Sequence, residues 1–231
     1  MTKEIAFCVP CCSYNREWDN VYDSLLHKYF LSTLLQYPPS SGMKIDIFLG
    51  YNDDDKIFSD FEERCKLGAT LIQHDNINLH WFEYNEDFRG KPTWIWNQLV
   101  EEAIEVGHNY FFCCGDDIVF PKDRGWINCM INTLKRNDNK GICAGDSGNP
   151  NLPMTQFLIH RNHYKIKSWV FPPLIKNWGC DNWIQEVYHK KNVFYFPQYK
   201  LLNVGGDPRY DIEFNRRFIS KLVDRYRKDY N

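Results

Sequence analysis

Two adjacent aspartates, Asp116 and Asp117, carry the strongest chemical signal in the sequence. They follow an apolar run over residues 111–114, and residues 118–120 are apolar again. Neighbouring carboxylates repel one another, and a divalent cation removes that repulsion. Hard oxygen ligands suit Mn²⁺ or Mg²⁺, and such a metal can neutralise the charge of a departing diphosphate. The alternative is a turn that carries two solvated aspartates.

Polar side chains also follow two other apolar runs that are typical of buried strands. Tyr14 and Asn15 come shortly after residues 4–10, and the aspartates of residues 53–55 follow residues 44–51. In parallel sheets, ligands bind beyond the carboxyl ends of the strands. Three polar clusters at strand ends therefore predict one ligand-binding cleft.

The elements that must position these clusters alternate along the first half of the chain. We expect strands over residues 4–10, 44–51, 78–84 and 109–114, and helices over residues 57–66 and 92–107. A further helix with its apolar face over residues 18–30 is expected between the first two strands, and residues 38–42 end it. Such alternation predicts an α/β fold with a mostly parallel central sheet and helices on both faces.

The second half is less regular. Helices are expected over residues 126–134, 181–189 and 211–230, and strands over residues 141–144, 155–160, 193–196 and 200–204. The length suits one domain.

The order of these motifs resembles that of the GT-A glycosyltransferases. Residues 109–118 are similar to the acidic metal-binding motif of that family, usually written DxD, and residues 90–97 are similar to the helix start that precedes it. Val9-Pro10 followed by Tyr14-Asn15-Arg16 is similar to the opening Pro-x-Tyr-Asn, with two extra residues inserted. The adjacent Asp-Asp departs from Asp-x-Asp, so the division of work between the two aspartates stays open.

The resemblance implies a Rossmann-like GT-A domain over residues 1–231. Residues 1–120 would form its nucleotide-sugar-binding half, and residues 121–231 its acceptor-side half. The implied reaction moves a sugar from a nucleoside diphosphate donor, a UDP-sugar being favoured, to a hydroxyl of a glycan, protein or lipid acceptor.

The resemblance also implies roles for individual residues. Tyr14 and one carboxylate among Asp53, Asp54 and Asp55 would contact the base and the ribose. Lys91 and Asn97 would lie near the nucleotide or the donor sugar. Asp117 would bind the Mn²⁺ or Mg²⁺ ion, with Asp116 as a second ligand or directed toward the ribose or sugar hydroxyls. Ordinary alternatives remain open: a packed tyrosine, a solvated turn and an exposed lysine.

Asp181 is the candidate catalytic base. An inverting transferase needs a group that deprotonates the acceptor hydroxyl, and Asp181 resembles the acidic residue at a helix start that has this role in inverting GT-A enzymes. Trp178 and Trp183 flank it and would stack on sugar rings. The alternative is that Asp181 caps the helix that follows.

The segment over residues 203–210 could close the site. Its two glycines, Gly205 and Gly206, let the backbone approach a ligand. Arg209 would pair with phosphate oxygens. Asn203 stands nearest to the place where the family sometimes supplies a histidine to the metal. A plain turn before the last helix is the alternative.

Composition narrows the partners and the compartment. The net charge of −2 argues against nucleic-acid binding. No apolar run approaches the length of a membrane span, and no targeting signal is evident, so a cytoplasmic protein is expected, in a host cytoplasm if the source is viral. The nine cysteines suggest reduced thiols. A zinc site made from Cys8, Cys11, Cys12, Cys113 and Cys114 lacks the usual knuckle spacing.

Two other functions remain as alternatives. A sugar nucleotidyltransferase would make a nucleotide sugar, but such enzymes usually carry a glycine-rich, arginine-containing segment after the first strand, where this sequence has residues 11–15, Cys-Cys-Ser-Tyr-Asn. A non-catalytic module of the same fold would bind the donor without turning it over. The last helix carries a basic run that is expected to be a solvated face, and docking on a membrane surface toward a lipid-linked acceptor is the alternative; its members are Arg216, Arg217, Lys221, Arg225, Arg227 and Lys228.

Overall fold

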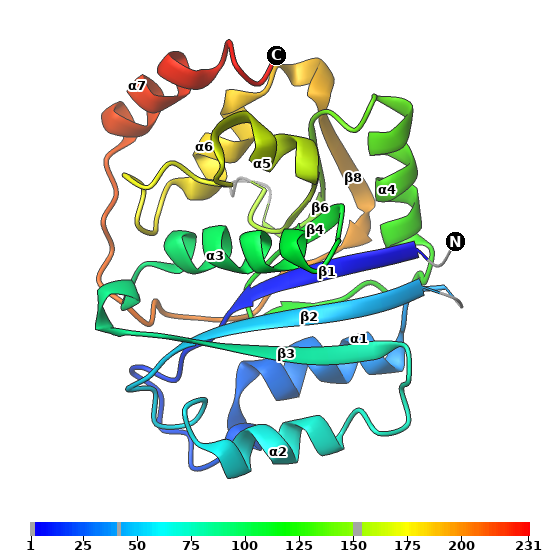
Figure 1. Cartoon of the computed structure of the whole chain (residues 1–231), viewed down its shortest axis with the longest axis vertical. Helices are drawn as coiled ribbons and strands as arrows, with labels where there is room; N and C mark the ends of the chain where they lie inside the picture. The colour runs from blue at the N-terminus through cyan, green and yellow to red at the C-terminus, as the bar shows by residue number, and fades with distance from the viewer. Residues whose placement is uncertain (1–2, 41–42, 150–153) are drawn as a thin grey trace.

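A seven-stranded sheet forms the centre of the computed structural model, which describes residues 3–40, 43–149 and 154–231 (Figure 1). Its strand order is β3-β2-β1-β4-β7-β6-β8, and a second sheet pairs β5 with β9. The strands are β1 Lys3–Pro10, β2 Met43–Asn52, β3 Ile77–Tyr84, β4 Tyr110–Cys113, β5 Ile118–Val119, β6 Ile142–Asp146, β7 Phe157–His160, β8 Val193–Lys200 and β9 Leu202–Asn203.

Helices cover both faces of the sheet, as Figure 1 shows for α3 on one side and α1 and α2 on the other. The α-helices are α1 Ser32–Gln36, α2 Phe61–Ala69, α3 Pro92–Glu105, α4 Trp126–Arg136, α5 Arg161–Lys167, α6 Cys180–Val187 and α7 Arg216–Tyr226. Short helices of other types are η1 Val21–Asp23, η2 Leu26–Leu31, η3 Glu86–Phe88 and η4 Lys190–Asn192. None of the helices in the described ranges is long and apolar enough to cross a bilayer.

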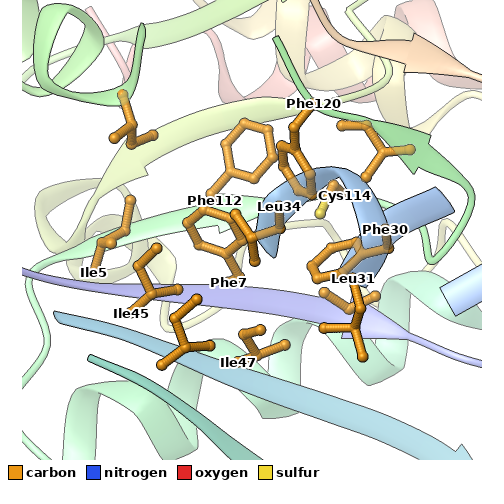
Figure 2. Close-up of a cluster of buried hydrophobic side chains, with 14 of the residues drawn as sticks. Ile5, Phe7, Phe30, Leu31, Leu34, Ile45, Ile47, Phe112, Cys114 and Phe120 are labelled. Atoms are coloured by element: carbon orange, nitrogen blue, oxygen red, sulfur yellow. The ribbon is translucent and has the colours of Figure 1, made fainter. Parts of the chain in front are cut away.

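The side chains of β1 point alternately to the two faces of the sheet, so this strand contributes to two hydrophobic clusters. Ile5, Phe7 and Val9 point into the cluster beneath α1, η2 and α4, whereas Ala6 and Cys8 point into the cluster beneath α3 and α6. Figure 2 shows the first cluster, in which Phe7 packs against aromatic rings from β4 and the segment after β5. A strand that is buried on both faces has a continuous apolar sequence, and residues 5–9 of β1 have this pattern.

The parallel arrangement of the first four strands positions the candidate site. β2 pairs in parallel with both β1 and β3, and β1 pairs in parallel with β4. Their carboxyl ends therefore meet at one edge of the sheet. β7 is antiparallel to β4 and to β6, so the sheet is mixed beyond β4. The expected α/β class with a mostly parallel sheet is confirmed.

The first expected helix is wrong in its continuity. Three short helices, η1, η2 and α1, take its place, and the last ends at Gln36, just before the prolines expected to end the helix. Ser24 interrupts the helical path with an extended backbone, and its hydroxyl donates to Val21 O at 2.5 Å and accepts from His27 N at 3.2 Å. Serine competes in this way with helical backbone bonds, which the apolar spacing alone does not reveal.

The last expected helix, 211–230, is too long at both ends. α7 begins only after Asn215, whose side chain accepts from Phe218 N at 3.0 Å. Residues 211–213 follow an extended path because the side chain of Asn177 holds the carbonyl of Asp211 and the N–H of Glu213, each at 3.0 Å.

Three smaller features also differ from expectation. The first strand expected near Pro197, 193–196, continues through the proline to Lys200 as β8, which tolerates proline because it lies at the sheet edge. The second, 200–204, contains β9. α5 was not expected, and it is capped by His160, whose ring nitrogen accepts from Asn162 N at 3.2 Å. The strand β5 and its pairing with β9 were also missed.

Candidate functional site

Asp116 lies fully buried at the carboxyl end of β4 and is held by Arg209. The Nη1 of Arg209 donates to Asp116 Oδ2 at 2.6 Å, its Nη2 donates to Oδ1, and Nη1 also donates to Cys12 O at 2.8 Å. Both carboxylate oxygens are therefore engaged in a bidentate ion pair. Such pairs combine charge with fixed geometry. Arg209 was expected to pair with phosphate oxygens, but in the structure its guanidinium is engaged by Asp116 and Cys12 O.

The carboxylate of Asp117 contacts Arg209 less closely than that of Asp116. Asp117 Oδ2 lies 3.9 Å from Arg209 Nη2, and the Asp117 side chain is 13% exposed. Burial, with the charge of Asp116 next to it, raises the pKa of Asp117 to about 6, although Arg209 opposes that shift. A cation placed beside Asp117 would remove this penalty.

The segment after β9 folds back over the two aspartates. Arg16 Nη2 donates to Gly205 O at 3.1 Å and to Asp207 O at 2.5 Å, and Val204 N donates to Asp117 O at 3.0 Å. A Cβ added to Gly205 would lie 1.8 Å from Asp117 Oδ2, so a side chain there would force the Asp117 carboxylate to move. The plain-turn interpretation of this segment is too simple, because it ties the loop after β1 to the aspartates.

A pocket of about 550 Å³ opens beside this loop. It is lined by Ser13, Tyr14, Asn15, Arg16, Glu17, Asp54, Lys56 and Arg89. These residues follow β1, β2 and β3, the three strands whose carboxyl ends are neighbours. Three of the lining side chains are cationic and two, Glu17 and Asp54, are acidic, so the lining carries a small net positive charge that favours an anionic ligand.

Tyr14, Asp54 and Arg89 form a cluster on the wall of the pocket. The Tyr14 hydroxyl donates to Asp54 Oδ1, Arg89 Nη1 donates to Asp54 Oδ2 at 2.8 Å, and the Arg89 guanidinium lies 4.5 Å from the centre of the Tyr14 ring. Partial burial and the bond to Asp54 raise the pKa of Tyr14. The cluster stays solvent-exposed and offers an aromatic face and charged groups to a ligand.

The three aspartates after β2 have different positions. Asp54 lines the pocket, and Asp53 is exposed with its N–H donating to Tyr84 O at 2.8 Å. Asp55 is buried, and it accepts from Ser13 N and Oγ and from the backbone N–H groups of residues 57 and 58 at 2.6–3.0 Å. Asp55 therefore fixes the loop after β1, and its expected ribose contact does not fit this geometry.

Asn97 is also structural. Its Oδ1 accepts from Val170 N and Phe171 N at 2.8 and 2.9 Å, and its Nδ2 donates to Phe171 O at 2.9 Å. Its three bonds tie α3 to the segment before α6, so the expected nucleotide contact of Asn97 does not fit. Lys91 begins α3, donates to Asp87 O at 2.5 Å and lies over the Trp94 ring at 4.0 Å. Lys91 does not line the pocket.

Asp181 lies in the first turn of α6, but the capping position belongs to Gly179, which has a φ of 89°. The expected alternative, a helix cap by Asp181, is therefore wrong. Its Oδ1 accepts from Asn182 N at 2.9 Å, and burial raises its pKa. A carboxylate with a raised pKa suits proton transfer near neutral pH. Trp183 is fully buried and packs in the core, so it offers no face to a sugar, whereas Trp178 is 45% exposed.

A divalent cation fits Asp117 better than Asp116 or Asn203. Asp116 gives both oxygens to Arg209, and Asn203 Oδ1 accepts from Gly205 N at 3.1 Å. Across residues 3–40, 43–149 and 154–231, no group of three His, Cys, Asp or Glu side chains is placed to hold a metal, and the five cysteines considered for zinc form none. Asp117 would thus be one ligand among others that come from the bound diphosphate and water.

The pocket contains three cations that were not singled out from the sequence. Arg16, Lys56 and Arg89 follow three different strands. Arg89 stands one residue before the motif over residues 90–97, in which Lys91 had been given the role of the cation. An arginine in the short segment between the third strand and α3 was the available signal.

Comparison with solved structures shows the same fold in transferases, although no protein-family model and no curated protein sequence matches the chain. The S. aureus TarS 1–349 structure in complex with UDP-GlcNAc aligns with a TM-score of 0.60 and 11% identity, over 96% of this chain and 65% of that one. A second TarS 1–349 structure gives 0.58 and 10%, over 87% and 60%. The chain spans less than two thirds of each.

Nucleotidyltransferases align over their whole length. The inositol-1-phosphate CTP transferase from T. maritima gives a TM-score of 0.51 at 13% identity, over 99% of this chain and 98% of that one. A cytidylyltransferase from Leptospira borgpetersenii gives 0.52 at 9%, over 100% and 97%. At these identities the likeness shows the fold: the chain has the α/β architecture that glycosyl- and nucleotidyltransferases share.

Proposed function

We propose that this protein is a glycosyltransferase that uses a nucleoside diphosphate sugar, favouring UDP, and a divalent metal, Mn²⁺ or Mg²⁺. The observation that carries the proposal is the position of the 550 Å³ pocket, which opens at the carboxyl ends of parallel strands beside the loop that covers Asp116 and Asp117. TarS, which shares the fold, has a structure in complex with UDP-GlcNAc, and this supports the choice of donor.

The pocket would receive the nucleoside. The base would stack on the half-buried Tyr14 ring, and the Asp54 carboxylate would accept from ribose hydroxyls. Arg89 holds both side chains in place through its contact with the ring and its bond to Asp54. Removal of the ring would therefore weaken nucleotide binding more than removal of the tyrosine hydroxyl.

The diphosphate would extend from the pocket toward Asp117. Arg16 lines the pocket and also binds the covering loop, so it lies between the two regions. When bound, the metal would neutralise negative charge on the leaving diphosphate. Asp117 would hold that metal, Arg209 would keep Asp116 neutralised, and the loop over residues 203–209 would exclude water from the phosphates.

Asp181 would take the proton of the acceptor hydroxyl. Burial raises its pKa, which makes its carboxylate a stronger base than an exposed aspartate, and the reaction would invert the anomeric carbon. The acceptor would be a hydroxyl of a glycan, protein or lipid. Comparison of the anomeric configuration of product and donor tests inversion. Full activity of Asp181→Asn would eliminate Asp181 as the base.

The experiment that tests the function is a panel of nucleotide sugars with Mn²⁺ or Mg²⁺, with nucleotide release measured with and without a chelator. We expect release from at least one donor, abolished by the chelator and reduced at least a hundredfold in Asp117→Asn. Asp75→Asn, an exposed aspartate before β3, is the matched control. If no donor is bound or hydrolysed in a metal-dependent manner, the proposal is wrong.

One observation favours a second candidate, a sugar nucleotidyltransferase: two cytidylyltransferase-type structures match the full length of both chains. Residues 11–15 lack the glycine-rich, arginine-containing segment expected after the first strand of such enzymes. Pyrophosphate release from a nucleoside triphosphate and a sugar phosphate would identify this activity. Donor binding without any release would instead identify a binding module.

A further inference from the structure

An exposed apolar patch lies where the segment before α6 meets the start of α7. Leu174, Trp178, Ile212 and Phe214 are 60%, 45%, 48% and 49% exposed. Three of them border a groove of about 160 Å³ that Phe218 also lines. A Cβ added to Gly179 would lie 3.2 Å from Phe214 Cδ2, so the two segments are in close contact. Large apolar side chains gathered at the surface mark an interaction site.

A cationic row continues from this patch along α7. Arg217, Lys221 and Arg225 recur every four residues on the exposed side, opposite the buried Ile219, Leu222 and Val223. This spacing places them on one stripe of the helix.

The three cations of the row lack acidic partners among the described residues. Within the ranges that the structure describes, none of its three cations forms an ion pair, although Arg225 lies 5.4 Å from the Tyr226 ring centre. Three nearby acidic side chains face cations outside the row: Asp224 lies 4.0 Å from Arg227, Glu213 pairs with Lys176 at 3.0 Å, and Asp229 pairs with Lys167 at 2.8 Å. Asp211 is exposed beside the patch. The row itself therefore keeps its positive charge, with one exposed carboxylate near the patch.

Charge is also distributed unevenly along the whole chain, with the excess of cations in the part that contains the row. Residues 161–231 contain 14 Lys and Arg against 7 Asp and Glu, whereas residues 1–160 contain 14 against 23. The net charge of −2 therefore conceals a cationic carboxyl-terminal third and an acidic remainder. A polarised molecule orients toward a negatively charged partner before contact.

We propose that this surface, formed by Leu174, Trp178, Ile212, Phe214 and the cationic row, docks the protein peripherally on an anionic lipid membrane. Exposed tryptophan and aliphatic side chains beside a row of Lys and Arg match an interface whose interior is apolar and whose surface is negatively charged. A soluble polyanion would engage the cations but would leave the apolar patch in water. The proposal concerns a different surface from the nucleotide pocket and does not depend on the reaction.

Vesicle sedimentation tests the proposal. The full chain is mixed with phosphatidylcholine vesicles or with mixed phosphatidylcholine–phosphatidylglycerol vesicles at low and high salt. We expect binding to the anionic vesicles, weakened by salt. Lys221→Gln with Arg225→Gln should reduce the affinity about 25-fold. Lys44→Gln with Lys122→Gln removes two exposed cations elsewhere and should have little effect.

The apolar contribution has its own variants. Trp178→Ala with Phe214→Ala should reduce the affinity for anionic vesicles about tenfold while leaving the affinity for long-chain polyphosphate unchanged. Thermal melting verifies that each variant is folded. The proposal is overturned if anionic and neutral vesicles bind equally, if the two pairs of cation variants behave alike, or if the apolar variants affect neither ligand.

Discussion

Two clusters at the same sheet edge pair an aspartate with an arginine, yet their environments differ. In Asp116–Arg209 the side chains are 0% and 12% exposed, whereas in Asp54–Arg89 they are 41% and 58% exposed. The buried pair cannot dissociate without leaving a charge in a medium of low dielectric. The exposed pair loses little when it opens. The buried pair therefore fixes the frame of the site, and the exposed pair is free to rearrange around a ligand.

The largest expected effect comes from breaking the buried pair. Arg209→Met leaves Asp116 unpaired in the interior and should lower the free energy of unfolding by about 3–5 kcal/mol. The matched variant Arg89→Met should lower it by less than about 1 kcal/mol. Chemical denaturation measures both. Equal losses would show that burial does not separate the two clusters.

Asp117 should give the folded state an unusual pH dependence. Its pKa is raised to about 6 in the folded protein, above its ordinary value. The folded state therefore binds more protons than the unfolded state between these values, and stability from this group falls as the pH rises from about 4 to about 6, by about 3 kcal/mol. Asp117→Asn should remove this fall. Urea denaturation at both ends of that range measures it, and an unchanged profile in Asp117→Asn would contradict the assignment.

The contact of the covering loop with Asp117 should tolerate no side chain at residue 205. Gly205→Ala places a Cβ 1.8 Å from Asp117 Oδ2 and should cost about 1–3 kcal/mol of unfolding free energy. Gly68→Ala is the control, because a Cβ there meets nothing within 4 Å inside α2 and should slightly stabilise the helix. A neutral Gly205→Ala variant would mean that the loop does not cover Asp117 in solution.

The smallest effect on stability is expected in the exposed cluster. Tyr14→Phe removes the bond to Asp54 but keeps the ring, and should change the free energy of unfolding by less than about 0.5 kcal/mol. The same denaturation experiments measure it. A loss of several kcal/mol would show that the Tyr14 hydroxyl supports the frame, as Arg209 does.

The fold was predictable because its strands carry their own signal. β1 and β4 lie inside the sheet and are buried on both faces. Their sequences are therefore apolar at nearly every position, which identifies them as buried strands. The points at which a helix is interrupted or begins late were harder to predict. Ser24 and Asn177 redirect the chain through hydrogen bonds of their side chains to the backbone, and the apolar periodicity that identifies helices does not reveal such bonds.

The sequence indicated the sheet edge at which the candidate site lies, but it indicated only some of the individual residues that line it. Asp53, Asp54 and Asp55 are equivalent in the sequence, and only the backbone of the turn decides that one is buried and one faces the pocket. The partners Asp116 and Arg209 are 93 residues apart, so their pairing depends on the tertiary fold. Arg16, Lys56 and Arg89 converge for the same reason.

Calorimetric titration of UDP into the protein with Mn²⁺ tests the central claim most directly. The account predicts saturable binding to one site, lost on chelation and weakened at least tenfold in Tyr14→Ala through loss of base stacking, whereas Tyr14→Phe binds nearly as well as the natural sequence. Absence of binding, or binding that is indifferent to both Mn²⁺ and the Tyr14 ring, would contradict a nucleoside diphosphate site in this pocket.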